Sequence, residues 1–164
     1  MSTNEPKSEG CPCVALNAER IAPWGGHRGN LDVSFTQGDN QDVASTNFCT
    51  APSFWNGTTF RIPVAGLYYT SINFVRQYDH EFHDNFALQL IHNNGTVIGS
   101  ALALANQHKD AQTGHYNLVT KFDHGDELKL RTWNGTPESP AEIRAISWSL
   151  FHLCCDAFAE LPPC

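Results

Sequence analysis

The sequence contains little charge and no cluster of basic residues. Charged residues make up 16% of the 164 residues, and the formal net charge is −7 with only 10 Lys and Arg. Phosphates and anionic lipids are bound by clustered cations, so this composition argues against nucleic acid and membrane surfaces as partners. No apolar run approaches the roughly 18 residues that a membrane-spanning helix needs. We therefore expect a partner that is protein rather than nucleic acid or membrane.

The N-terminus lacks the apolar segment of a signal peptide. Its first 13 residues, MSTNEPKSEGCPC, are polar throughout. Secretory signals need an apolar stretch of 7–15 residues, so we expect synthesis in the cytoplasm. The protein then stays inside or leaves by another route, such as lysis, virion assembly, a dedicated machine or removal of a leader.

No helical spacing of apolar residues persists beyond a turn, and the chain instead shows short apolar runs between turn residues. This pattern predicts an all-β antiparallel sandwich over residues 14–153, a polar arm over 1–13 and a Cys- and Pro-containing tail over 154–164. The expected strands are Val14–Ile21, Leu31–Thr36, Thr58–Val64, Gly66–Arg76, Phe86–His92, Val97–Ala105, Gly114–Phe122, Glu127–Thr132 and Ile143–Leu153.

The triplet Asn-Gly-Thr occurs three times, at residues 56–58, 94–96 and 134–136. Each triplet fits the acceptor pattern for N-glycosylation, but Asn-Gly is also the strongest short hairpin turn, since both residues tolerate positive φ. Without a visible signal peptide we favour turns. Asn94-Gly95, between two apolar runs, is the best hairpin candidate.

Pro63 and Gly66 interrupt the most strand-like segment, WNGTTFRIPVAGLYY. Proline cannot donate to a strand ladder, and glycine permits a sharp bend with positive φ. We expect one strand to end at Pro63 and a long strand to begin at Leu67, with the corner between them.

The order of residues in this segment, F-R-I-P-V-A-G-L-Y-Y, resembles the signature of the complement C1q-like and tumour necrosis factor-like jelly-roll superfamily. Further segments resemble its later strands and turns in the expected order: residues 86–95, 115–119, 122–126, 128–130 and 146–151. The resemblance covers roughly residues 32–153. It implies a jelly roll that assembles as a compact homotrimer, although the Gly-x-y collagen stalk of complement proteins is absent.

Two expected strands are apolar or aromatic on both faces. In Gly66–Arg76 one parity holds Tyr68, Ile72 and Phe74, while the other holds Leu67, Tyr69 and Val75. A half-exposed sheet should be polar on one side, so we expect the second face to be covered by other copies of the chain. The expected trimer-interface residues are Leu67, Tyr69, Val75, Phe151 and Leu153.

The six cysteines are concentrated at the two ends of the chain, at positions 11, 13, 49, 154, 155 and 164. The spacings CPC and CC fit a four-ligand zinc site poorly. Disulfides between the terminal arms, within or between protomers, are our favoured interpretation, and reduced thiols and a metal site are the alternatives. The crosslink candidates are Cys11, Cys13, Cys154, Cys155 and Cys164.

Residues 78–84, YDHEFHD, concentrate carboxylates and imidazoles between two expected strands. They suggest a divalent-cation site, with calcium as the candidate because some members of the resembled family hold it. The spacing matches no defined metal-binding loop, and a solvated polar loop is the favoured interpretation. The candidate ligands are Asp79, His80, Glu81, His83 and Asp84.

No hydrolase signature such as G-x-S-x-G or H-E-x-x-H is present. We therefore expect a non-enzymatic, homotrimeric structural or adhesive module, with arms that attach it to a larger assembly such as a virion head, decoration, fibre or surface appendage. We expect its location to be the virion or the extracellular surface. The alternative is a free trimeric recognition protein that binds a receptor or a glycan.

Overall fold

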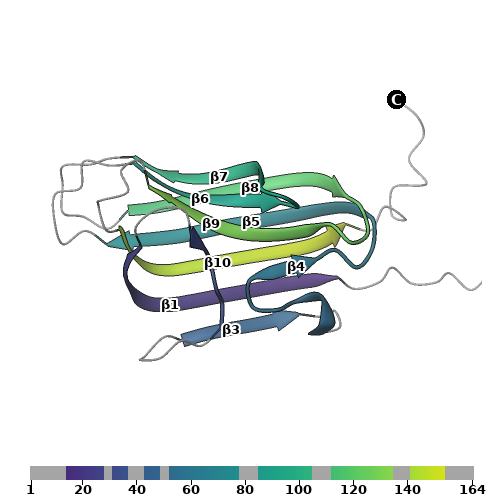
Figure 1. Cartoon of the computed structure of the whole chain (residues 1–164), viewed down its shortest axis with the longest axis horizontal. Helices are drawn as coiled ribbons and strands as arrows, with labels where there is room; N and C mark the ends of the chain where they lie inside the picture. Colours follow the sequence, from purple (N-terminus) through teal and green to yellow (C-terminus); the bar gives the residue numbers. More distant parts are fainter. Residues whose placement is uncertain are drawn as a thin grey trace, which may run out of the picture.

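The computed structural model describes residues 14–27, 31–36, 43–48, 52–77, 85–104, 112–134 and 141–153. These residues form two antiparallel sheets that face each other (Figure 1). Sheet A has the strand order β3-β1-β10-β5-β8, and Figure 1 shows β3, β1, β10 and β5 side by side in that order from the bottom. Sheet B has the order β2-β9-β6-β7, with β4 paired to β9.

The strands are long in sheet A and shorter in sheet B. Sheet A consists of β1 (Ala15–His27), β3 (Val43–Phe48), β5 (Gly66–Gln77), β8 (Gln112–Phe122) and β10 (Ala141–Leu153). Sheet B consists of β2 (Leu31–Asp32), β4 (Thr59–Arg61), β6 (Phe86–His92), β7 (Thr96–Ala103) and β9 (Glu127–Asn134). One 3₁₀ turn, η1 (Pro52–Phe54), precedes β4, and none of the described helices could cross a membrane.

The core lies between the two sheets, and buried residues alternate with more exposed ones along most strands; β6 is an exception, because Ala87 and Ile91 of its other parity are buried too. In β5 the buried residues are Tyr68, Thr70, Ile72, Phe74 and Arg76, and the residues between them are more exposed. Successive side chains of a strand point to opposite faces, so one parity of each strand fills the core. Trp148 on β10 is fully buried, and its ring centroid lies 5.9 Å from that of Trp55. Its Nε1 donates a hydrogen bond to Thr70 Oγ1 at 3.0 Å.

Two expected strands are shorter than predicted, and one strand was missed. Within 31–36 only Leu31–Asp32 is a strand, yet Val33 and Phe35 are buried as the alternation predicts. Within 58–64 only Thr59–Arg61 pairs as a strand. β3, with the sequence VASTNF, was not predicted because its pairing with β1 outweighs a weak local pattern.

The corner between β4 and β5 differs from the prediction at Gly66. Pro63 lies in the bend between these strands, and Gly66 is the first residue of β5. The glycines with positive φ are Gly57, Gly95 and Gly125, so Gly66 is not required for a left-handed backbone. A Cβ at Gly66 would instead clash with the imidazole of His152 on β10, so this glycine permits close approach of a side chain.

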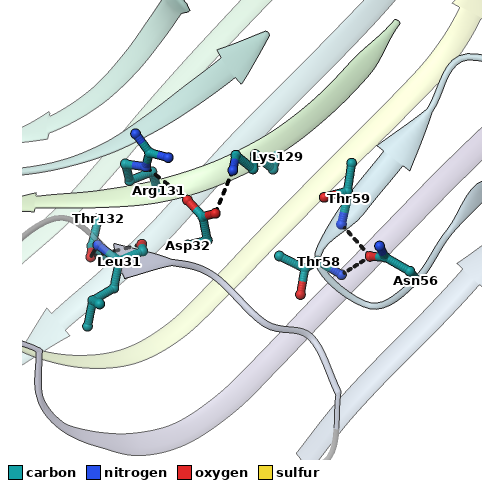
Figure 2. A network of polar contacts seen from close by, with 8 residues as sticks. All are labelled: Leu31, Asp32, Asn56, Thr58, Thr59, Lys129, Arg131 and Thr132. Atoms are coloured by element: carbon teal, nitrogen blue, oxygen red, sulfur yellow. Dashed lines mark hydrogen bonds and ion pairs between the residues drawn. The ribbon is translucent and has the colours of Figure 1, made fainter. Parts of the chain in front are cut away.

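The hairpin between β6 and β7 turns through Asn93-Asn94-Gly95. Asn93 and Gly95 both adopt positive φ, at 47° and 108°, so the Asn-rich turn was located correctly but extends one residue earlier than Asn94. The turn at 56–58 is stabilised by the side chain of Asn56, whose Oδ1 accepts hydrogen bonds from the amides of Thr58 and Thr59 at 2.9 and 2.7 Å (Figure 2).

Candidate assembly surface

The surface of sheet A that faces away from the core presents side chains from four strands in aligned rows. We call this surface the outer face of sheet A, and the register of β1, β10, β5 and β8 defines its rows. The aromatic row is Ala15, Phe151, Tyr69 and Val119, and the aliphatic row is Ile21, Ala145, Val75 and Thr113. Two polar rows lie between them: Asn17, Ser149, Ser71 and Asn117, then Glu19, Ser147, Asn73 and His115.

The apolar residues of this face are exposed in the single chain. Ile21, Val119 and Phe151 expose 56%, 54% and 43% of their surface. The rings of Tyr69 and Phe151 are stacked, with centroids 6.5 Å apart and an interplanar angle of 21°. Leu153 and Leu67 extend the apolar surface beyond the aromatic row. Large contiguous apolar patches are uncommon on monomeric proteins and mark interaction sites.

The polar rows are largely satisfied by hydrogen bonds within the face. Ser149 Oγ donates to Asn17 Oδ1 at 2.8 Å, and Tyr69 Oη donates to Asn117 Oδ1 at 3.2 Å. Asn73 Nδ2 donates to the hydroxyls of Ser71 and Ser147, at 3.4 Å each. Polar groups that are buried need hydrogen-bond partners. Another protein surface could therefore cover these rows and exclude water, and these groups would keep the hydrogen bonds named above.

A hollow of about 210 Å³ lies where the aliphatic row meets the second polar row. Its lining includes Ile21, Val75 and Ala145, together with Glu19, Asn73 and Ser147. The walls are therefore mainly apolar, with one carboxylate at the side. A hollow of this size can receive a side chain from another protein surface.

The outer face of sheet B has a different chemistry. Asp32 on β2 lies between two cations of β9, and its carboxylate accepts hydrogen bonds from Lys129 Nζ at 2.6 Å and Arg131 Nε at 2.9 Å (Figure 2). Burial alone would raise the pKa of Asp32, but the hydrogen bonds and charges of Lys129 and Arg131 outweigh it and lower that pKa. Arg61 and Glu127 form another ion pair, at 2.7 Å. These paired charges suit a solvated surface.

One end of the sandwich is held by a polar cluster around Asp126, in the turn between β8 and β9. The Asp126 carboxylate accepts hydrogen bonds from Asn93 Nδ2 and the Asp123 amide, both at 2.9 Å, and lies 2.9 Å from His92 Nε2. Burial would raise the pKa of Asp126, but the bonds from Asn93, Asp123 and His92 outweigh it and lower that pKa. The cluster ties the β6–β7 hairpin to the β8–β9 turn and is a structural feature.

All five residues predicted for the trimer interface, Leu67, Tyr69, Val75, Phe151 and Leu153, lie on the outer face of sheet A. The structure adds Ile21 and Val119 to the same face. Val119 could have been found in the same way as Tyr69, from a strand that is apolar on both faces. Leu118 and Val119 are adjacent, so their side chains point to opposite faces, and both are apolar. Ile21 could have been found from the alternation along its strand. Leu16, Ala18 and Arg20 have one parity and are buried, so Ile21, with the other parity, points to the outer face.

The other predicted sites lie outside the described residues. These are the candidate cation ligands Asp79, His80, Glu81, His83 and Asp84, and the cysteines at 11, 13, 154, 155 and 164. Among the residues that the structure does describe, no group of three or more His, Cys, Asp or Glu side chains could hold a metal ion. The described chain ends do lie side by side, since the His152 amide donates to the Val14 carbonyl at 2.9 Å.

Comparison with known proteins adds a structural match but no match by sequence. No protein-family model matches the chain, and no curated protein matches it. The globular domain of zebrafish complement 1qA superposes with a TM-score of 0.57 and 15% identity, covering 86% of this chain and 98% of that one. The fold is the C1q/TNF jelly roll.

Two tumour necrosis factor ligands share this jelly roll. Murine APRIL superposes with a TM-score of 0.57 and 10% identity, over 86% of this chain and 99% of that one. The Eiger TNF of S. frugiperda superposes with a TM-score of 0.51 and 12% identity, over 94% of this chain and 100% of that one. At such identities the likeness concerns the C1q/TNF jelly roll itself, which the sequence resemblance had predicted.

Proposed function

We propose that this protein is a non-enzymatic homotrimeric module that assembles through the outer face of sheet A. The observation that carries the proposal is the chemistry of this face, where exposed apolar rows flank polar rows whose serines and asparagines bond to one another. Burying apolar surface contributes about 25 cal/mol for each Å², so covering these rows favours association. The resemblance to C1q-like and tumour necrosis factor-like proteins supports three copies rather than two.

The proposed role is that of a structural or adhesive unit displayed on a larger assembly, such as a virion or a surface appendage. The two terminal arms, residues 1–13 and 154–164, would attach it. The arms leave neighbouring strands at one end of sheet A, because Ala15 of β1 pairs with Phe151 of β10. This shared departure point supports a disulfide crosslink between the arms.

The first experiment measures the molar mass of the full chain by light scattering after gel filtration. We expect three times the monomer mass, and a monomer at all concentrations would overturn the proposal. A non-reducing gel with thiol counting then tests the arms. A chain that migrates only as monomer with six free thiols would remove the crosslink from the proposal.

A second experiment separates the proposed role from the alternative. The chain reduced to residues 14–153 should still form trimers but lose association with the particle or appendage that carries the full-length protein. If the full-length trimer is instead free and binds a glycan or a receptor, the recognition function is correct and the structural role is not.

A further inference from the structure

Glu19 is a carboxylate without a partner at the edge of an apolar hollow. It lies half-buried on the outer face of sheet A, beside Ile21, Val75 and Ala145. Within the described part of the chain it makes no hydrogen bond or ion pair. The opposite face of the molecule provides a contrast, because Asp32 there is bound by two cations of its own chain.

Covering this face with another protomer would remove water from the Glu19 carboxylate. An ionised group that loses water without a partner carries a large free-energy penalty. A partner that places a basic side chain or another hydrogen-bond donor beside Glu19 removes this penalty. Among the described residues, the basic side chains on this side of sheet A are His115, Lys121 and Arg144, and Arg144 already has another interaction.

The register distinguishes His115 from Lys121. Glu19 on β1 and His115 on β8 belong to the same row, through Ser147 and Asn73. Lys121 lies six residues further along β8, which is about 20 Å at 3.3 Å per residue. The proposed homotrimer is taken to have its threefold axis parallel to the strands of sheet A. Rotation about such an axis preserves height along it, so rows of neighbouring protomers then meet at equal height. The β1 side of one protomer then faces His115 of the next.

A contact between Glu19 and His115 of one chain is excluded by the sheet itself. Two strands, β10 and β5, separate β1 from β8, so the two residues are three strand spacings apart, about 14 Å. Any direct contact between them must join two chains.

We propose that Glu19 of one protomer binds His115 of the next, so that three such pairs form a ring in the assembly. This inference rests on the proposed homotrimer and names a polar contact within it. Protonation of an imidazole adds a positive charge that attracts a neighbouring carboxylate, so we expect the ring to strengthen the trimer as the solution becomes more acidic.

The surroundings of both residues contain few competing charges. On the outer face, β5 contributes Asn73 and Val75 beside His115, and β7, which also contacts β8, has no titratable residue. The nearest titratable group of β5 on this face is Tyr69, two rows away. Beside Glu19, β10 contributes Ala145, Ser147 and Arg144, and Arg144 has another interaction.

The decisive experiment is a crosslink in the full chain. After mild oxidation, the double variant Glu19→Cys, His115→Cys should give a band of a covalent trimer on a non-reducing gel. This band should come in addition to any bands that the unmodified chain gives after the same treatment. Because a disulfide needs Cα atoms within about 7 Å, the bond cannot form within one chain. The matched control Glu19→Cys, Lys121→Cys should not produce the band, and neither should either single variant.

The second measurement is the dissociation of the trimer as a function of pH. Between pH 8 and pH 5.5 we expect tighter association by up to about fivefold for each pair, or about a hundredfold for three. Glu19→Gln and His115→Gln should each remove most of this dependence, and the swap Glu19→His, His115→Glu should restore it.

The outcomes separate this inference from the homotrimer on which it rests. A monomer at every pH refutes the homotrimer. A trimer that gives no crosslink between positions 19 and 115, and whose dissociation does not respond to Glu19→Gln, refutes the Glu19–His115 contact alone. A crosslink that produces a ladder beyond three chains refutes the closed ring.

Discussion

The two outer faces of this sandwich both expose apolar side chains, among them Leu31, Val97 and Leu102 on sheet B, but they differ in how their polar groups are arranged. On sheet B, Asp32, Lys129 and Arg131 form ion pairs within the chain. On sheet A, aromatic and aliphatic rows flank serines and asparagines that bond to each other. Both sheets bury their other side in the same core, so the difference concerns only what each outer face meets. A face with its charges paired suits water, whereas a face with apolar rows and mutually bonded serines and asparagines suits protein.

The largest expected effect comes from placing a charge in the aromatic row. Phe151→Glu would bury an unpaired carboxylate in each copy, and we expect association to weaken by about 100-fold or more. Leu31→Glu is the matched control, because Leu31 on sheet B has the same 43% exposure as Phe151. Light scattering over a concentration series measures the effect. Equal loss of assembly in both variants would contradict the distinction between the faces.

A substitution in the core that both sheets share should lower the stability of the fold, whichever outer face takes part in assembly. Trp148→Ala removes a fully buried ring that lies against Trp55 and Phe35. We expect a loss of about 3–5 kcal/mol in the free energy of unfolding, measured by denaturant titration. A loss below about 1 kcal/mol would show that the two sheets do not share a tightly packed core at this position.

Asp126 lies in the turn that joins the two sheets and on neither outer face. Its pKa is lowered in the folded state, so its contribution to stability is present above the unfolded value near 3.9 and is lost as the pH falls through the folded pKa. Asp126→Asn should cost about 1–2 kcal/mol at pH 7 and flatten the dependence of stability on pH in acid. Urea titrations from pH 7 to pH 3 test this, and the molar mass of the assembly should not change.

The smallest expected effect is on the charged face. Asp32→Asn removes the ion pairs with Lys129 and Arg131, which are about one-third exposed and screened by water. We expect about 0.5 kcal/mol of lost stability and no change in assembly. Thermal unfolding at low and high salt checks this, because high salt should reduce the difference between the variant and the parent. A variant that fails to assemble would show that sheet B is also part of the interface.

Alternation and turn chemistry were sufficient to predict most of the fold. The parity of Tyr68, Ile72 and Phe74 against Leu67, Tyr69 and Val75 was visible in the letters, because side chains of a strand alternate whatever surrounds it. Asn-Gly turns were located for a similar reason, since positive φ favours these residues locally. The candidate interface residues that lie on these strands were predictable from the same alternation.

Other features depend on partners far away in the sequence and were not predictable. Arg76 is buried although arginine is usually exposed, and its guanidinium lies 5.5 Å from the centroid of the Phe86 ring, which is far away in the sequence. Gly66 is needed for the imidazole of His152 rather than for a positive φ. β3 exists because β1 is there to pair with it.

The sequence by itself determined most of the strands, which parity is apolar and where several turns occur, because these properties depend on neighbours within a few residues. Only the tertiary structure decided which side chains stand in one row. The register between β1, β10, β5 and β8 brings Phe151 beside Tyr69, and it places Glu19 and His115 in one row of the same face, three strand spacings apart. Register is set by pairing across the whole chain, so the pattern of the assembly surface appears only in the folded protein.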